Sequence, residues 1–191
     1  MRSPTVRGWP AAPVHPKRGG WAGGPNVGEG CWDDPAATGA ALRHGGLNTG
    51  DLGEMDADGF LRITGRKKDL LVLSNGKKVA PSFIEGLLLA DPCIDQVVVC
   101  GEGRNYLCAL LVPAWDNVRR ELESADSVLP ESPVELARLP AVRRLLEQRV
   151  RTALTEVSNA EQVKKFAILP EPFSVAAEEL TVSMKLRRDV I

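Results

Sequence analysis

Four charged side chains, one carboxylate and three cations, are the first candidates for binding or catalysis. Asp51 follows Thr49-Gly50 in the stretch TGDL, Arg66 and Lys68 lie in the stretch GRKKD, and Lys185 stands close to the end of the sequence. A carboxylate accepts hydrogen bonds through two oxygens, whereas arginine and lysine donate to anionic groups. Taken singly, Asp51 is explained as an ordinary turn residue and Lys185 as an ordinary surface lysine. Their order along the chain is what makes them candidates.

Several common catalytic patterns are missing. The run Ser74-Asn75-Gly76-Lys77-Lys78 has the Gly-Lys step of a phosphate-binding loop, but it lacks the upstream glycine and the hydroxyl residue after the lysine. His15 lies in an irregular stretch and His44 in a Gly-flanked turn, so no Ser-His-Asp or Cys-His set is indicated. The cysteines form no Cys-x-x-Cys pair, so a metal site is not expected. Those in apolar surroundings are expected to be reduced and buried, namely Cys93, Cys100 and Cys108.

The composition is that of an ordinary globular protein. Of 191 residues 43% are hydrophobic and 26% are charged, and the formal net charge is -1. This balance argues against binding of nucleic acid or an anionic membrane by the chain as a whole. Because the sequence shows neither a long apolar run nor a secretory signal, a cytoplasmic location is expected.

The first part of the chain differs from the rest. Residues 1–30 hold 5 Pro and 7 Gly and show no helical or strand period. Such a stretch offers little apolar surface to offset the entropy of ordering. Residues 1–24 are therefore expected to be an irregular leader.

Clear elements begin at residues 60–64 (FLRIT), a predicted strand that precedes the charged segment 65–69. Two strand-like runs then flank residues 74–76, and Asn-Gly between such runs is a strong hairpin signal. Ser82 and Glu85 have the spacing of a capping box, which predicts a helix that ends at about Ala90.

The remaining sequence predicts an α+β domain, in which helices cover a small antiparallel sheet. Residues 94–102 and 106–113 are apolar strands joined by a short turn, so they are expected to pair antiparallel. Helices are predicted at residues 116–124 and from Pro140 onward, and a last strand at residues 163–169. The arginines of the second helix are expected to form a solvated face, namely Arg143, Arg144, Arg149 and Arg151.

Residues 24–85 resemble the later core motifs of the adenylate-forming acyl-CoA synthetases, because TGDL, GRKKD and the stretch that follows appear in that family's order. Residues 179–188 (ELTVSMKLRR) resemble the closing lysine motif of the long-chain fatty-acid branch. The resemblance implies leftover strands of a large AMP-binding domain at 25–64, a hinge at 65–69 and a C-terminal lid domain at 70–191. It also implies the substrates ATP, a fatty acid and CoA, with Mg2+ held by residues outside this chain.

Roles for single residues follow from the same resemblance. It implies that Asp51 accepts the ribose hydroxyls of the nucleotide, that Arg66 reaches the ribose or phosphate side, and that Lys68 is the hinge. Lys185 would stabilise charge during adenylate formation. The turn formed by Ser74, Asn75 and Gly76 would line the passage for CoA, where a glycine allows close backbone approach.

The sequence also departs from the family. Gly46, Asn48 and Val182 replace a tryptophan, a histidine and a proline that are common there, and no phosphate loop or acyl pocket is recognisable. The chain alone is therefore expected to be an inactive C-terminal portion of a long-chain fatty-acid CoA ligase. The alternative is a stand-alone lid that docks to a separate AMP-binding subunit. A weaker option is anion or nucleic-acid binding through Lys67, Lys68, Lys77, Lys78 and the arginine face.

Overall fold

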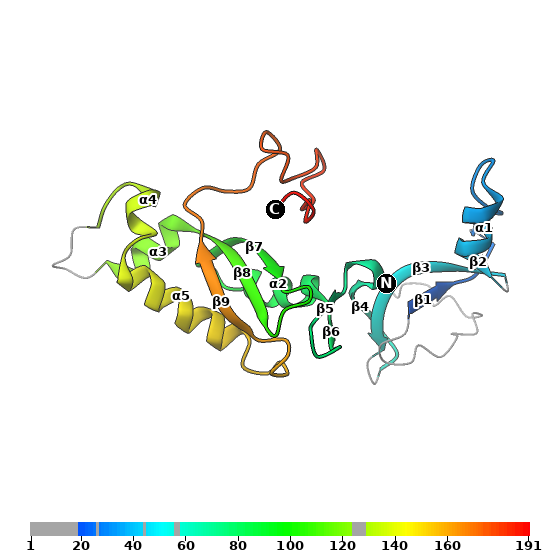
Figure 1. The fold of residues 1–191 in the computed structure, drawn as a ribbon, viewed down its shortest axis with the longest axis horizontal. Helices are drawn as coiled ribbons and strands as arrows, with labels where there is room; N and C mark the ends of the chain where they lie inside the picture. Colours follow the sequence, from blue (N-terminus) through cyan, green and yellow to red (C-terminus); the bar gives the residue numbers. More distant parts are fainter. Residues whose placement is uncertain (1–18, 26, 44, 56–57, 124–128) are drawn as a thin grey trace, which may run out of the picture. The chain divides into compact units, whose positions relative to one another are not determined.

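A computed structural model of the chain describes residues 19–25, 27–43, 45–55, 58–123 and 129–191, and His15 and His44 lie outside these ranges. The chain divides into two compact units, Met1–Leu70 and Leu71–Ile191 (Figure 1). None of the described helices has the length and apolar content that crossing a membrane requires.

The first unit is a four-stranded antiparallel sheet with β3 (Gly46–Met55) at its centre. Each of the other strands pairs with β3: β1 (Gly19–Ala22), β2 (Leu42–Arg43) and β4 (Leu61–Arg66). The unit also holds the helix α1 (Pro35–Ala41) and the 3-10 turn η1 (Lys67–Asp69). The strand predicted at 60–64 is confirmed as β4. Residues 19–22 form a strand where irregular chain was expected, because pairing with β3 outweighs their weak local strand propensity.

The second unit combines a hairpin, a three-stranded sheet and four helices in the described ranges. The hairpin consists of β5 (Leu71–Val72) and β6 (Lys78–Val79), and the sheet has the order β7-β8-β9. Its strands are β7 (Ile94–Cys100), β8 (Leu107–Pro113) and β9 (Val163–Ile168). Its helices are α2 (Pro81–Leu89), α3 (Trp115–Leu122), α4 (Pro133–Leu136) and α5 (Pro140–Ala153).

The strands of the second unit follow the prediction with one difference. β7 and β8 pair antiparallel and β5 and β6 form the hairpin around Gly76, so both of these predictions are confirmed. β9 pairs with β8 in parallel, whereas the predicted sheet was antiparallel. The reason is the long helical crossover through α3, α4 and α5, which returns the chain to the sheet in its original direction.

The predicted capping box at the start of α2 is wrong. The helix begins at Pro81 after the cap residue Ala80, and no side chain caps it. Glu85 is instead buried and accepts a hydrogen bond from the backbone N–H of Val99 on β7. Ser82 and Glu85 had the right spacing for a cap, but proline already stabilises the first turn and Glu85 lies on the helix face that packs on the sheet.

Apolar side chains pack on both faces of the three-stranded sheet. One cluster joins the sheet to the helices and includes Ile84, Leu107 and Leu146. A second cluster on the other face brings together Val98, Val112, Phe173 and Leu180, and so attaches the segment after β9. Cys93 is buried as predicted, but Cys100 at the end of β7 is exposed.

Candidate functional site

Asp51 and Arg66 lie side by side on two adjacent strands of the first unit's sheet. They are directly paired residues of β3 and β4, and Arg66 Nε lies 2.9 Å from Asp51 Oδ1. The Asp51 side chain is 27% exposed and that of Arg66 is 57% exposed. An ion pair this open to solvent contributes only about 0–1 kcal/mol to stability, so both groups remain accessible for a ligand.

The chain just before Asp51 is held by its own side chains. The N–H of Asp51 donates to Thr49 Oγ1 at 3.1 Å, and the N–H of Gly50 donates to Asn48 Oδ1 at 3.2 Å. Gly50 has a φ of +72°, a conformation that favours glycine. These local bonds fix the backbone that carries the Asp51 carboxylate.

A pocket of about 490 Å³ lies beside this pair, within the size range of small-molecule sites. Thr49, Gly50, Arg66, Lys67 and Lys68 line it. Its three cations suit an anionic ligand such as a phosphate. The structure therefore brings Asp51, Arg66 and Lys68, three residues singled out by the sequence, to one place in the first unit.

The turn at residues 74–76 connects β5 and β6 in the second unit. Gly76 has a φ of +77°, and its N–H donates to the carbonyl of Leu73 at 2.8 Å. The N–H of Lys77 donates to Asn75 Oδ1 at 3.0 Å. This geometry confirms that Asn-Gly forms the tight turn of a hairpin.

The hairpin is tied to the turn between β7 and β8. The Ser74 hydroxyl donates to Asn105 Oδ1, and the Ser74 N–H donates to the carbonyl of Arg104 at 3.0 Å. The N–H of Gly103 donates to the carbonyl of Val72 at 2.8 Å. The sequence predicted two independent turns, but the hydrogen bonds between them join both turns into one edge of the unit.

Lys185 is exposed at the base of a tight loop, residues 181–185, which we call the lysine loop. The N–H of Thr181 donates to the carbonyl of Lys185 at 2.8 Å, and the N–H of Lys185 donates to Thr181 Oγ1 at 3.0 Å. An antiparallel bridge between Leu180 and Leu186 closes the loop. Among the described residues, no hydrogen bond or ion pair joins Lys185 to the turn at 74–76.

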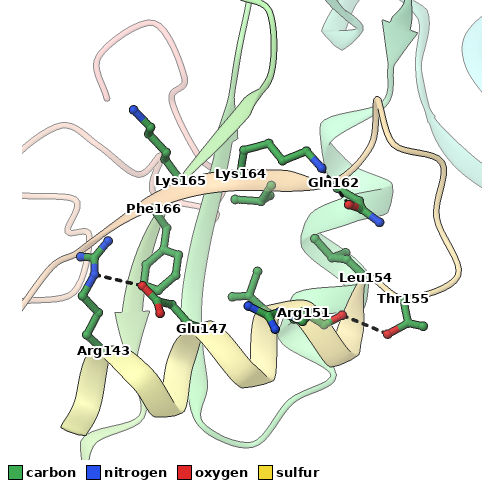
Figure 2. A pocket seen from close by; sticks show the side chains of 11 residues that line it. Arg143, Glu147, Arg151, Leu154, Thr155, Gln162, Lys164, Lys165 and Phe166 are labelled. Atoms are coloured by element: carbon green, nitrogen blue, oxygen red, sulfur yellow. Dashed lines mark hydrogen bonds and ion pairs between the residues drawn. The ribbon is translucent and has the colours of Figure 1, made fainter. Parts of the chain in front are cut away.

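A larger groove of about 570 Å³ runs between α5 and β9 (Figure 2). Its walls mix apolar side chains with the cations Arg143, Arg151, Lys164 and Lys165. Figure 2 shows Arg143 beside Glu147 and close to the ring of Phe166. Arg143 Nε lies 3.1 Å from Glu147 Oε1, and Arg143 Cζ lies 5.2 Å from the centroid of the Phe166 ring. The sequence indicated the arginines but not this groove, since only the fold brings Lys164 and Lys165 next to them.

The predicted solvated face of α5 is only partly solvated. Arg149 pairs with Glu121 at 2.7 Å and lies 3.9 Å from Asp91, and its side chain is 30% exposed. Burial alone would lower the pKa of Arg149, but Asp91 and Glu121 raise it above its ordinary value. Arg149 is thus a structural cation that ties α5 to α3 and to the end of α2.

Comparison with known proteins identifies relatives. The family described as AMP-binding enzyme C-terminal domain matches residues 68–174. The chain is 38% identical over 162 residues to the long-chain-fatty-acid–CoA ligase FadD15 of Mycobacterium tuberculosis, covering 85% of this chain and 27% of the relative. It is 34% identical over 174 residues to human long-chain-fatty-acid–CoA ligase 1, covering 86% of this chain and 24% of that protein.

A solved structure of an adenylation domain has a fold similar to that of this chain. The chain aligns with the adenylation domain of a carboxylic acid reductase from Segniliparus rugosus, solved with AMP and a co-purified carboxylic acid, at a TM-score of 0.64 and 26% identity. The match covers 84% of this chain and 24% of that one. The chain thus spans about a quarter of the length of the curated relatives it matches.

Proposed function

Because the chain belongs to the AMP-binding enzyme C-terminal domain family, we propose that it is the C-terminal portion of a long-chain fatty-acid CoA ligase. Such an enzyme joins a fatty acid to ATP, giving an acyl-adenylate and pyrophosphate. It then transfers the acyl group to the thiol of CoA and releases AMP. The observation that carries the proposal is a pocket lined by Arg66 and Lys68, with Asp51 paired to Arg66, in a chain whose curated relatives are named as ligases of this kind.

The proposed nucleotide site uses the first unit. Asp51 accepts hydrogen bonds from the two ribose hydroxyls, since one carboxylate can accept two donors side by side. Arg66 turns from Asp51 toward the ribose or phosphate oxygens, which its exposure and its position on the pocket wall allow. When Arg66 turns from Asp51 to the nucleotide, the chain loses only a solvent-exposed ion pair, which contributes little to the free energy of folding.

The proposed hinge lies at Lys68 in η1. The boundary between the two compact units falls just after it, between Leu70 and Leu71. A few changes of backbone dihedral angle in such a segment can swing one unit against another without breaking a core. In this proposal the swing alternates between adenylate formation and thioester formation.

Two parts of the second unit have proposed roles in these steps. Lys185 approaches the reacting carboxylate and the α-phosphate and stabilises the charge that develops there. The turn at 74–76 lines the passage for CoA, where Gly76 allows close approach of the backbone. Its hydrogen bonds to Arg104 and Asn105 keep this turn rigid.

The resemblance also implies Mg2+. Within the described ranges no three His, Cys, Asp or Glu side chains gather closely enough to hold a metal ion. We name no magnesium ligand among the described residues and assign no step of the chemistry to this ion.

The proposal is tested with a hybrid ligase, in which this chain replaces the matching portion of the mycobacterial relative. We expect the hybrid to form acyl-CoA from ATP, a long-chain fatty acid and CoA. The chain alone should release no pyrophosphate above background. A folded hybrid without activity would contradict the proposal, and activity on simple mixing of the two separate pieces would favour the docking lid.

A further inference from the structure

Glu85 is the one buried charged residue in the described part of the chain, with 6% of its surface exposed. It lies on α2 and both of its carboxylate oxygens are engaged. Oε1 accepts the N–H of Val99 at 2.8 Å, and Oε2 accepts Arg188 Nη2 at 2.5 Å. A buried carboxylate is tolerated only with such partners, and loss of one of them is costly.

Arg188 completes the arrangement with a second bond. Its Nη1 donates to the carbonyl of Val99 at 3.2 Å. Val99 lies on β7, an edge strand of the three-stranded sheet, and its N–H and carbonyl bond to Glu85 and Arg188 rather than to a neighbouring strand. The two side chains occupy the place of a neighbouring strand, and they join α2, β7 and the end of the chain.

The lysine loop lies just before Arg188 in the sequence. The segment after β9 contains no helix or strand (Figure 1), so its position depends on side-chain anchors. Leu180 and Leu186 provide an apolar anchor at the two ends of the loop, where they join the cluster with Val98. Arg188 provides the polar anchor, two residues beyond the bridge.

The tip of the loop has no such support. Val182 is 92% exposed and Met184 is 66% exposed, so neither side chain packs on the body of the unit. The direction in which Lys185 points is therefore set at the base of the loop.

We propose that the Glu85–Arg188 pair is a positioning device for Lys185, which fixes the base of the lysine loop on α2 and β7. The inference rests on the proposed function of Lys185 in adenylate formation. Arginine suits this role because two nitrogens of one planar group reach Glu85 Oε2 and the Val99 carbonyl at once. A lysine at this position would keep the positive charge, but its single nitrogen would lack the planar pair of donors that reaches both acceptors.

The first test is amide hydrogen exchange on the full chain, which needs no enzymatic activity. We expect Arg188→Gln and Glu85→Gln to speed exchange of the amides of Thr181, Met184 and Arg187 by at least about tenfold, because the base of the loop opens. Exchange in α5 should rise by a smaller factor than in the lysine loop and stay slow, which reports that the unit remains folded. Unchanged exchange in the loop of a folded Arg188→Gln chain would overturn the proposal.

Arg187→Gln is the matched control. Arg187 is the neighbouring arginine, and its nearest carboxylate is the exposed Glu178, with Oε2 3.9 Å away. Removing its charge should leave exchange in the lysine loop as it is in the parent chain. An equal loosening by Arg187→Gln would show that the pair with Glu85 has no special part, and would also overturn the proposal.

The second test separates positioning from a general loss of structure. In the hybrid ligase, Arg188→Gln should slow formation of the acyl-adenylate by about tenfold or more, with thioester formation from a supplied acyl-adenylate changed by less than about threefold. Arg188→Lys should recover part of the first step. Equal loss in both steps would overturn the positioning role. A hybrid that is inactive before any substitution would contradict the proposed function instead. Hydrogen exchange alone would then test whether the Glu85–Arg188 pair fixes the lysine loop.

Discussion

Among single residues, Asp51 has the most specific proposed role, because its carboxylate pairs with Arg66, which lines the proposed nucleotide pocket. Asp51→Asn keeps the size of the side chain and removes its charge. Charge-assisted hydrogen bonds are worth about 1.5–3 kcal/mol, so the AMP dissociation constant of the hybrid ligase should rise by about ten- to a hundredfold. Isothermal titration calorimetry measures this change.

Glu29→Gln is the control for Asp51, since Glu29 is an exposed carboxylate of the same unit. Its substitution should leave AMP binding within about twofold, because an exposed charge outside the pocket is screened by solvent. A similar loss in both variants would mean that Asp51 acts only through the net charge of the unit.

The cysteines give a prediction about burial and pH. Burial raises the pKa of the Cys93 thiol, and Asp91 raises it further. Desolvation, together with the neighbouring Cys108, also raises the pKa of the exposed Cys100 thiol. A raised pKa means that the thiolate, which is the reactive form, appears only at higher pH.

Alkylation by iodoacetamide followed by peptide mass spectrometry should therefore modify Cys100 faster as the pH rises beyond the ordinary thiol range. Cys93 should stay unmodified in the folded chain at every pH at which the second unit remains folded. Rapid labelling of Cys93 in the native chain would contradict the packing of the core described above.

Among the helices and strands, the sequence predicted those that are specified by a short stretch of neighbouring residues. The hairpin at Gly76 and the strands β7 and β8 were predictable because a turn or an apolar run specifies each of them. The parallel pairing of β9 and the strand β1 depend on distant partners, β8 and β3. Glu85 shows the limit most clearly, since its spacing suggested a local cap while its real partner, Arg188, lies 103 residues away.

The same distinction applies to the candidate site. The motifs identified Asp51, Arg66 and Lys68 one by one, and the register of β3 and β4 places the first two opposite each other. The groove between α5 and β9 and the anchor of the lysine loop could not be predicted, because each requires segments that meet only in the folded chain.

The hairpin of the second unit can be tested through its glycine. Gly76 has a φ of +77°, and an alanine in this left-handed conformation costs about 1–2 kcal/mol. Gly76→Ala should lower the free energy of unfolding by that amount in urea denaturation.

Gly86→Ala is the matched control in α2, where a Cβ would meet nothing within 4 Å. Alanine should raise the free energy of unfolding there by about 0.5–1 kcal/mol, because glycine is a poor helix former. If Gly76→Ala were as well tolerated as Gly86→Ala, the turn would not have the conformation described.

For the molecule as a whole, the two compact units correspond to two different sets of proposed contacts. The first carries Asp51, Arg66 and Lys68, and the second carries the turn at 74–76 and Lys185. Neither set performs the full reaction in this proposal, since the chain spans about a quarter of its curated relatives. The proposed roles of both units are therefore tested in a larger enzyme that contains this chain.

The most direct measurement of that claim is acyl-adenylate formation by the hybrid ligase with and without Lys185. We expect the hybrid to form the adenylate and Lys185→Ala to slow this step by about a hundredfold or more, because the cation that stabilises the developing charge is lost. Lys77→Ala, at another exposed lysine of the same unit, should have little effect. A hybrid in which Lys185→Ala forms the adenylate as fast as the parent would contradict the account.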